Sequence, residues 1–345
     1  MTSLTPFAAP CVRACALRSG LLRPHEWHAL MEMGSADTVI TWLQARGVLP
    51  AEATAIPAAE RSAHQTVIQS SSALLRFARG DLGDLLQFFL TYYDLMNLES
   101  VIHRLHGTVE GGTSHGRPFE TGPLGLLDAS IGDVSNFAAL ARLLKRTLFA
   151  PPFEAALQRY NEDEDVSRMV ESIEVAFFAG WIAAAKRCGF RLNGGTDGSG
   201  LAVFLVECVS EAAVRLKLHR DAETSRIVEW LSLVTEGRPL DACLSVLSEG
   251  GDNGAVLKLA AILFSKRLVP GASQEPTGSL AALSLLRVMV LRQAIKANRG
   301  ITFNADFLTS LLVLQRFQAL ELTLLLESKD AGITDVTSAY GEIAA

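Results

Sequence analysis

The chain has 345 residues, of which 49% are apolar, 20% charged and 7% aromatic, and its formal net charge is −6. So much apolar surface can offset the loss of chain entropy on folding, which excludes an intrinsically disordered protein. The acidic balance argues against nucleic acid as a partner, because the phosphate backbone is bound by basic surfaces. The length exceeds that of a usual single domain, so we expect two or three packed units.

Membrane insertion is not expected from the distribution of apolar residues. A spanning helix needs about 18 or more consecutive apolar residues with few charges. The best candidates fall short, since 175–185 stops at Lys186 and 280–295 contains Arg287 and Arg292. We therefore predict no direct membrane span and no signal peptide. Five cysteines without a repeated spacing favour a reducing, cytoplasmic compartment over a disulfide framework.

The predicted elements are helices throughout, because alanine and leucine dominate and short alternating strands are hard to find. Residues 21–43 are read as two short helices, with Pro24 at a helix start and Ser35 as an N-cap. Pro151 and Pro152 are expected to break the chain after another helix, capped by Ser135. Helices are expected over 58–78, 85–105, 135–148, 153–160, 166–188, 201–218, 226–234, 240–247, 255–268, 280–296 and 306–326.

Three stretches of the chain resemble one another. Residues 30–43, 126–144 and, more loosely, 231–247 each combine the end of an apolar helix with a short amphipathic helix. Self-similarity at a long period is typical of folds stacked from one building block. We predict an all-α fold of three similar helical units whose helices can interleave. The units cover 1–115, 116–195 and 196–332, and a tail covers 333–345.

The nearest approach to a metal site lies close to the N-terminus. Cys11, Cys15, His25 and His28 supply the ligand types of tetrahedral zinc, but the intervening spacing is shorter than in a zinc finger and the two histidines are too close. Two small apolar residues on one helix face and two half-exposed histidines are the preferred interpretation.

Other patterns also lack the spacing that their chemistry requires. His103 and His106 have no second acidic partner at helical spacing. The acidic run 162–165 lacks the glycine that a calcium loop needs at its sixth position, where Arg168 stands. The glycines of 194–200 follow no strand and precede no Lys-Ser/Thr pair, unlike a phosphate loop. We therefore predict no catalytic residue, no cofactor and no metal.

Two polar residues interrupt the very apolar helix over 85–105. Asp94 and Asn97 are three residues apart and so share one helix face. Buried polar groups must be hydrogen-bonded, or they destabilise the fold. We predict a structural polar pair on a buried helix, bonded to each other, to Tyr92 or Tyr93, or to a neighbouring helix.

The segment 88–98, followed by Arg104 and Gly107, carries these two residues in an Asp-x2-Asn-Leu pattern. In this it resembles the C-type subunits of archaeal and bacterial A/V-type ATPases, a family that includes the d-type subunits of eukaryotic V-ATPases. In the third unit, Glu207 and Glu211 stand where the family pattern has an Asp and an Asn, which indicates a divergent member. Further similar segments follow in order along nearly the whole chain, at 11–22, 30–43, 122–125, 170–178, 303–311 and 322–333.

The resemblance implies a funnel-like, pseudo-threefold bundle. It also implies a non-catalytic central-rotor protein that links the central stalk to the membrane rotor ring and transmits torque for proton or sodium transport. Stalk and ring proteins would be its partners, and its place would be peripheral, on the cytoplasmic side of the membrane. The alternatives are an unrelated helical-repeat scaffold that binds a protein partner, and a helical metalloenzyme that uses the cysteines and histidines above.

Overall fold

The computed structural model describes residues 5–107, 118–127, 129–192, 199–220, 224–234, 279–299 and 303–333. Within these ranges all regular structure is helical, which confirms the all-α class. The helices predicted over 240–247 and 255–268 lie outside the described residues, as does the predicted tail beyond Ile333.

The α-helices follow the predicted order along the chain. They are α1 (Thr5–Leu17), α2 (Pro24–Glu32), α3 (Ala36–Ala45), α4 (Ile56–Leu75), α5 (Gly80–His106), α6 (Phe137–Leu144), α7 (Ala150–Asp163), α8 (Val166–Arg187), α9 (Gly200–Arg220), α10 (Thr224–Ser232), α13 (Ser279–Arg299) and α14 (Ala305–Asp330). Short 3-10 helices are η1 (Arg18–Gly20), η2 (Gly122–Leu124) and η3 (Ala129–Asp133).

Local sequence explains several helix ends. Pro24 lies in the first turn of α2, where a missing N–H costs nothing. The Ser35 hydroxyl caps α3 by accepting from the Thr38 N–H at 3.3 Å. Gly107 ends α5 in the left-handed region, at φ 79°, which a residue without Cβ adopts readily. The predictions for Pro24 and Ser35 are therefore confirmed, and α5 ends one residue beyond its predicted range.

The helices after η3 differ from the prediction. Asn136, and not Ser135, caps α6 by accepting from the Ala139 N–H at 2.9 Å. The helix also ends at Leu144, four residues before the predicted end. Pro151 and Pro152 do not break the chain, because they lie in the first turn of α7, where backbone N–H groups have no intrahelical acceptor.

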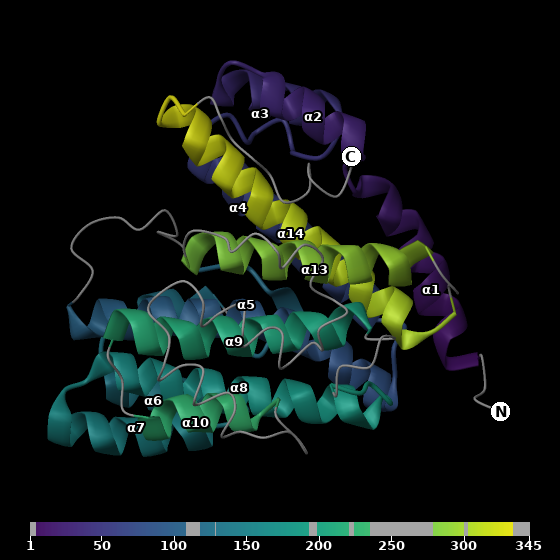
Figure 1. Cartoon of the computed structure of the whole chain (residues 1–345). Helices are drawn as coiled ribbons and strands as arrows, with labels where there is room; N and C mark the ends of the chain where they lie inside the picture. The colour runs from purple at the N-terminus through teal and green to yellow at the C-terminus, as the bar shows by residue number, and fades with distance from the viewer. Residues whose placement is uncertain are drawn as a thin grey trace.

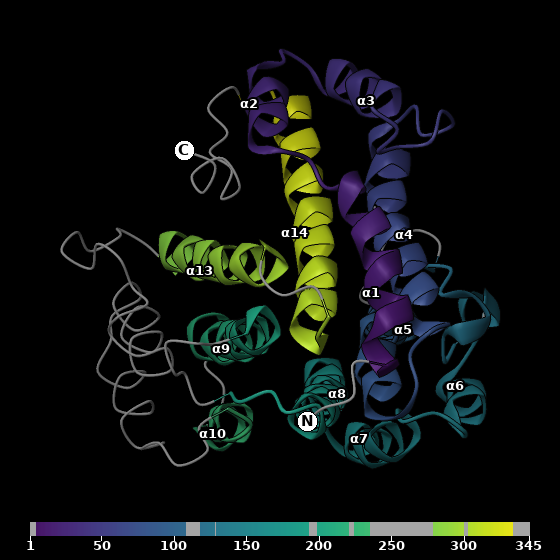
Figure 2. The same ribbon diagram turned by 90° about the vertical axis from the view of Figure 1, so that its right-hand side faces the viewer.

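The C-terminal helix packs among N-terminal helices. Figure 2 shows α14 and α4 upright and antiparallel, and α14 also contacts α1, α3 and α5. The last helix of the predicted third unit therefore lies against helices of the first, and the three-unit division itself stays a prediction.

The remaining helices are layered beneath this pair. Figure 1 shows α13, α9 and α8 stacked one below another, with α7 and α10 at the far side. Trp181 of α8 is fully buried at the centre of this part. Its ring centre lies 5.0 Å from that of Phe89 on α5 and 5.7 Å from that of Phe204 on α9. Such aromatic contacts bury large apolar areas, so they hold the three helices firmly together.

Among the described helices, α14 is long and apolar enough to cross a membrane by length and composition alone. The apolar runs weighed in the sequence did not include this stretch. In the structure 78% of its most apolar window is buried against the rest of the chain. It therefore has the surroundings of a core helix, and such helices pass the same test of length and hydropathy.

Candidate functional site

The two polar residues singled out in the sequence lie on α5. Asp94 is fully buried and Asn97 is 4% exposed. The two carboxylate oxygens of Asp94 accept from the Thr121 hydroxyl and from the Leu126 N–H, each at 2.8 Å. The side-chain amide of Asn97 bonds to both backbone groups of Phe119. It donates to the Phe119 carbonyl at 2.9 Å and accepts from the Phe119 N–H at 2.7 Å.

The partner of the polar pair is therefore the connecting segment 118–127, which enters η2. The predicted bonds between Asp94 and Asn97, or from them to a tyrosine or another helix, are wrong. A connecting segment has few backbone partners of its own, so side chains must satisfy its buried N–H and C=O groups. We refer to Asp94, Asn97 and their partners Phe119, Thr121 and Leu126 as the α5 clamp.

Burial raises the pKa of the Asp94 carboxyl group in the clamp. Removal from water raises the pKa of Asp94 to about 6, although the hydrogen bonds from Leu126 and Thr121 act in the opposite direction. The carboxyl group therefore titrates nearer to neutral pH than an exposed aspartate does. Both of its oxygens accept hydrogen bonds from the connecting segment, so the clamp can hold that segment in place.

A second polar site surrounds Arg316, on α14. Its guanidinium donates to the Tyr92 hydroxyl at 2.6 Å. The same group lies 4.1 Å from the centre of the Tyr92 ring and 4.9 Å from that of Phe204. Stacking on two aromatic faces compensates the partly buried cation and joins α14 to α5 and α9.

The two glutamates that depart from the family pattern face this site from α9. Arg287 of α13 lies 4.0 Å from a carboxylate oxygen of Glu207 and 3.9 Å from one of Glu211. Burial, and then repulsion by Glu211, raises the pKa of Glu207. Where these two glutamates replace the Asp and Asn of the family pattern, Arg287 of the neighbouring α13 therefore supplies a cation. This arrangement was missed in the sequence, although Arg287 visibly interrupts an apolar run.

A second acidic pair, Glu99 and Glu174, completes the same cavity. Glu174 of α8 lies 3.5 Å from Arg215 of α9. Burial and the nearby Glu174 raise the pKa of Glu99 to about 8. The cavity has a volume of about 280 Å³. We call it the charged cavity; its ionic wall consists of Glu99, Glu174, Glu207, Glu211, Arg215, Arg287 and Arg316.

The glutamates and arginines that line the charged cavity come from α5, α8, α9, α13 and α14. Within the described ranges no group of three or more His, Cys, Asp or Glu side chains is placed to hold a metal ion. Paired charges of this kind join helices and resist sliding of one helix past another.

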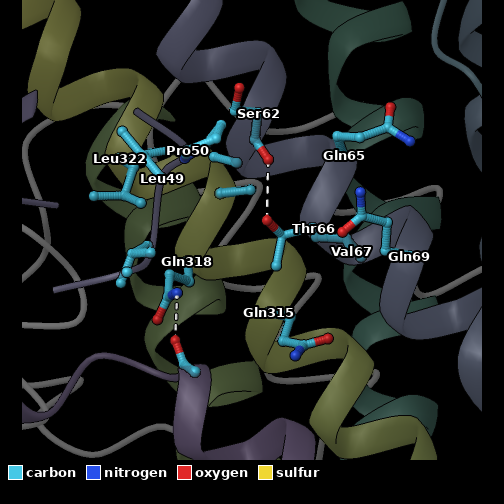
Figure 3. Close-up of a pocket in the computed structure, with 15 residues that line it drawn as sticks. Leu49, Pro50, Ser62, Gln65, Thr66, Val67, Gln69, Gln315, Gln318 and Leu322 are labelled. Atoms are coloured by element: carbon cyan, nitrogen blue, oxygen red, sulfur yellow. Dashed lines mark hydrogen bonds between the residues drawn. The ribbon is translucent and has the colours of Figure 1, made fainter. Parts of the chain in front are cut away.

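An uncharged cavity of about 410 Å³ lies between α4, α14 and the turn after α3. Figure 3 shows amide side chains from both helices around it, among them Gln315, Gln318 and Gln69. Gln318 donates to the Gly20 carbonyl at 3.2 Å and accepts from the Leu22 N–H at 2.7 Å. These two bonds join α14 to the chain that follows α1. No charged side chain lines the cavity among the described residues.

The N-terminal cysteines and histidines do not form a common site. Cys11 is buried and its Sγ lies 4.0 Å from the Asn304 carbonyl, while Cys15 is exposed. His25 and His28 are both exposed on α2.

The other motifs have structural surroundings of their own. His106 Nδ1 lies 2.6 Å from the Tyr160 hydroxyl. Asp165, at the end of the acidic run, caps α8 by accepting from the Arg168 N–H at 3.0 Å. Most of the glycine-rich stretch 194–200 lies outside the described residues, and its last glycine begins α9.

A comparison with protein families gives a match over the N-terminal part of the chain. The family model described as the ATP synthase (C/AC39) subunit matches residues 10–196, just over half of the chain. The matched stretch runs from α1 past the end of α8 and includes the whole α5 clamp. No curated protein matches the chain.

Proposed function

Because the chain belongs to the ATP synthase (C/AC39) subunit family, as its sequence motifs indicate, we propose that it links the central stalk of a V/A-type ATPase to the membrane rotor ring. In this role it transmits torque to the ring, which moves protons or sodium ions. The chain itself is non-catalytic and binds peripherally on the cytoplasmic side of the membrane. The observation that carries the proposal is the family match across the α5 clamp.

The internal connections of the chain suit a part that bears load. A torque-transmitting body must keep its shape while force passes through it, so segments between helices must be fixed. The α5 clamp holds segment 118–127 by four hydrogen bonds of 2.7–2.9 Å to buried side chains. The charged cavity joins α5, α8, α9, α13 and α14 in a similar way.

The proposed architecture is a funnel-like, pseudo-threefold arrangement of the units 1–115, 116–195 and 196–332. The packing of α14 against α4 and α1 supports interleaving between the first and third units. A low-resolution electron-microscopy envelope of the full chain tests this arrangement. A body with an axial opening agrees with the proposal, and a solid or rod-shaped envelope contradicts it.

Co-purification tests the proposed partners. The tagged full chain is expressed in its native host, and its complexes are isolated from gently solubilised membranes. We expect central-stalk and rotor-ring proteins in constant ratio to the chain. Recovery of the stator alone, or of the free chain with no other part of an ATPase, contradicts the proposal. Washed membranes from cells that express the tag alone provide the control.

A further inference from the structure

A groove of about 730 Å³ lies between the N-terminal part of the chain and the end of α13. Its walls come from the end of α1, η1, the first turn of α2 and the last turn of α13. It shares no lining residue with the α5 clamp or with the charged cavity.

Four arginines line this groove, and one of them is neutralised. Arg46 lies 2.6 Å from Glu26, whose pKa is lowered: burial would raise it, but hydrogen bonds from Arg46 and the Arg23 N–H outweigh that effect. Arg18, Arg23 and Arg299 are exposed and have no carboxylate within 4.0 Å in the described part of the chain. Counted over the described residues, the groove therefore carries an excess of three positive charges.

A buried hydrogen-bond donor lies in the same wall. Asn298 is 4% exposed, and its Nδ2 has no acceptor among the described residues. A buried donor without an acceptor destabilises the fold, and an acceptor from a ligand removes that penalty. The backbone carbonyl of Asn298 accepts from Arg18 at 3.2 Å, so the end of α13, where the helix dipole is negative, is already covered by a cation.

The chemistry of these groups selects the ligand. Three guanidinium groups and an amide N–H are all donors, so the ligand must be anionic and rich in acceptors. A single carboxylate has two oxygens and can accept a pair of hydrogen bonds from one guanidinium group. A phosphate or diphosphate has enough oxygens to accept from several guanidinium groups at once. We propose that the groove binds a phosphate-bearing anion, with Arg23 and Arg299 at the rim and Asn298 as the buried donor. This site is independent of the proposed coupling function.

Calorimetric titration of the full chain with inorganic pyrophosphate tests the site. Arg23→Gln combined with Arg299→Gln removes two exposed cations, and loss of two charge-assisted contacts is expected to weaken binding by about tenfold or more. The matched control combines Arg142→Gln with Arg146→Gln, which removes the same charge from exposed positions in and just after α6. Thermal melting of each variant verifies folding.

Flotation with phosphatidylcholine vesicles, with and without phosphatidic acid, separates a lipid headgroup from a free anion. Pyrophosphate binding that falls in the groove variant and persists in the control supports a soluble ligand. Binding only to vesicles with phosphatidic acid, with the same dependence on the variants, assigns the site to a lipid phosphate. Failure of the wild-type chain to bind either probe overturns the proposal, as does equal weakening in both double variants.

Discussion

Asn97→Leu removes one half of the α5 clamp with little change in side-chain volume. The packing of α5 is retained, but the N–H and the carbonyl of Phe119 both lose their hydrogen bond to the Asn97 amide. Phe119 is buried, so water cannot readily take the place of the amide. Each buried group left unpaired costs about 1–3 kcal/mol, so we expect Asn97→Leu to destabilise the fold by about 2–6 kcal/mol.

Thermal melting and amide hydrogen exchange measure this effect. We expect a lower melting temperature and faster exchange at the Phe119 N–H, because segment 118–127 is released from α5. The control is Asn161→Leu, an exposed asparagine on α7, for which a change within about 0.5 kcal/mol is expected. An Asn97→Leu protein that melts like the wild type, with Phe119 still protected from exchange, would refute the role of the clamp.

Three further predictions concern pH, packing and metal. The pKa values of Asp94 (about 6) and Glu99 (about 8) are raised by burial, so protonation stabilises the fold and this stabilisation is lost as the pH rises through them. Calorimetry should therefore give a higher melting temperature near pH 6 than near pH 8; a flat or opposite trend contradicts this. Gly200→Ala places a Cβ 2.5 Å from the Ser310 Oγ and 2.8 Å from a backbone Cα, which should destabilise by about 1–3 kcal/mol. Gly34→Ala, with nothing within 4 Å, should leave the circular-dichroism melt nearly unchanged. Treatment with a chelator should not alter the melt, and elemental analysis that finds one zinc per chain counts against this expectation.

The sequence predicts helix ends well where the signal is local. Ser35 and Gly107 act through bonds to residues a few positions away, so their roles follow from the chain itself. Pro151 and Pro152 fit the end of one helix and the start of the next equally well. The choice depends on how Phe149 and its neighbours pack, and this is a tertiary property.

The α5 clamp shows where prediction from sequence stops. Two polar residues in an apolar helix indicate that both are buried and bonded. Their partners lie 22 to 32 residues away in a segment without periodicity, so the pattern could not identify them. Glu207 and Arg287 each interrupt an apolar helix, and such interruptions could have been paired as a contact. The groove lined by Arg18, Arg23 and Arg299 combines residues from distant parts of the chain, so no local sequence pattern predicts it.

ATP-driven ion uptake by the reconstituted ATPase tests the coupling role most directly. The complete complex and a complex that lacks this chain are placed in sealed vesicles, and ATP hydrolysis and ion uptake are followed together. We predict that hydrolysis continues without the chain while uptake is lost, and that adding back the purified protein restores uptake. Uptake with an unchanged number of ions per ATP in its absence would contradict the proposed function.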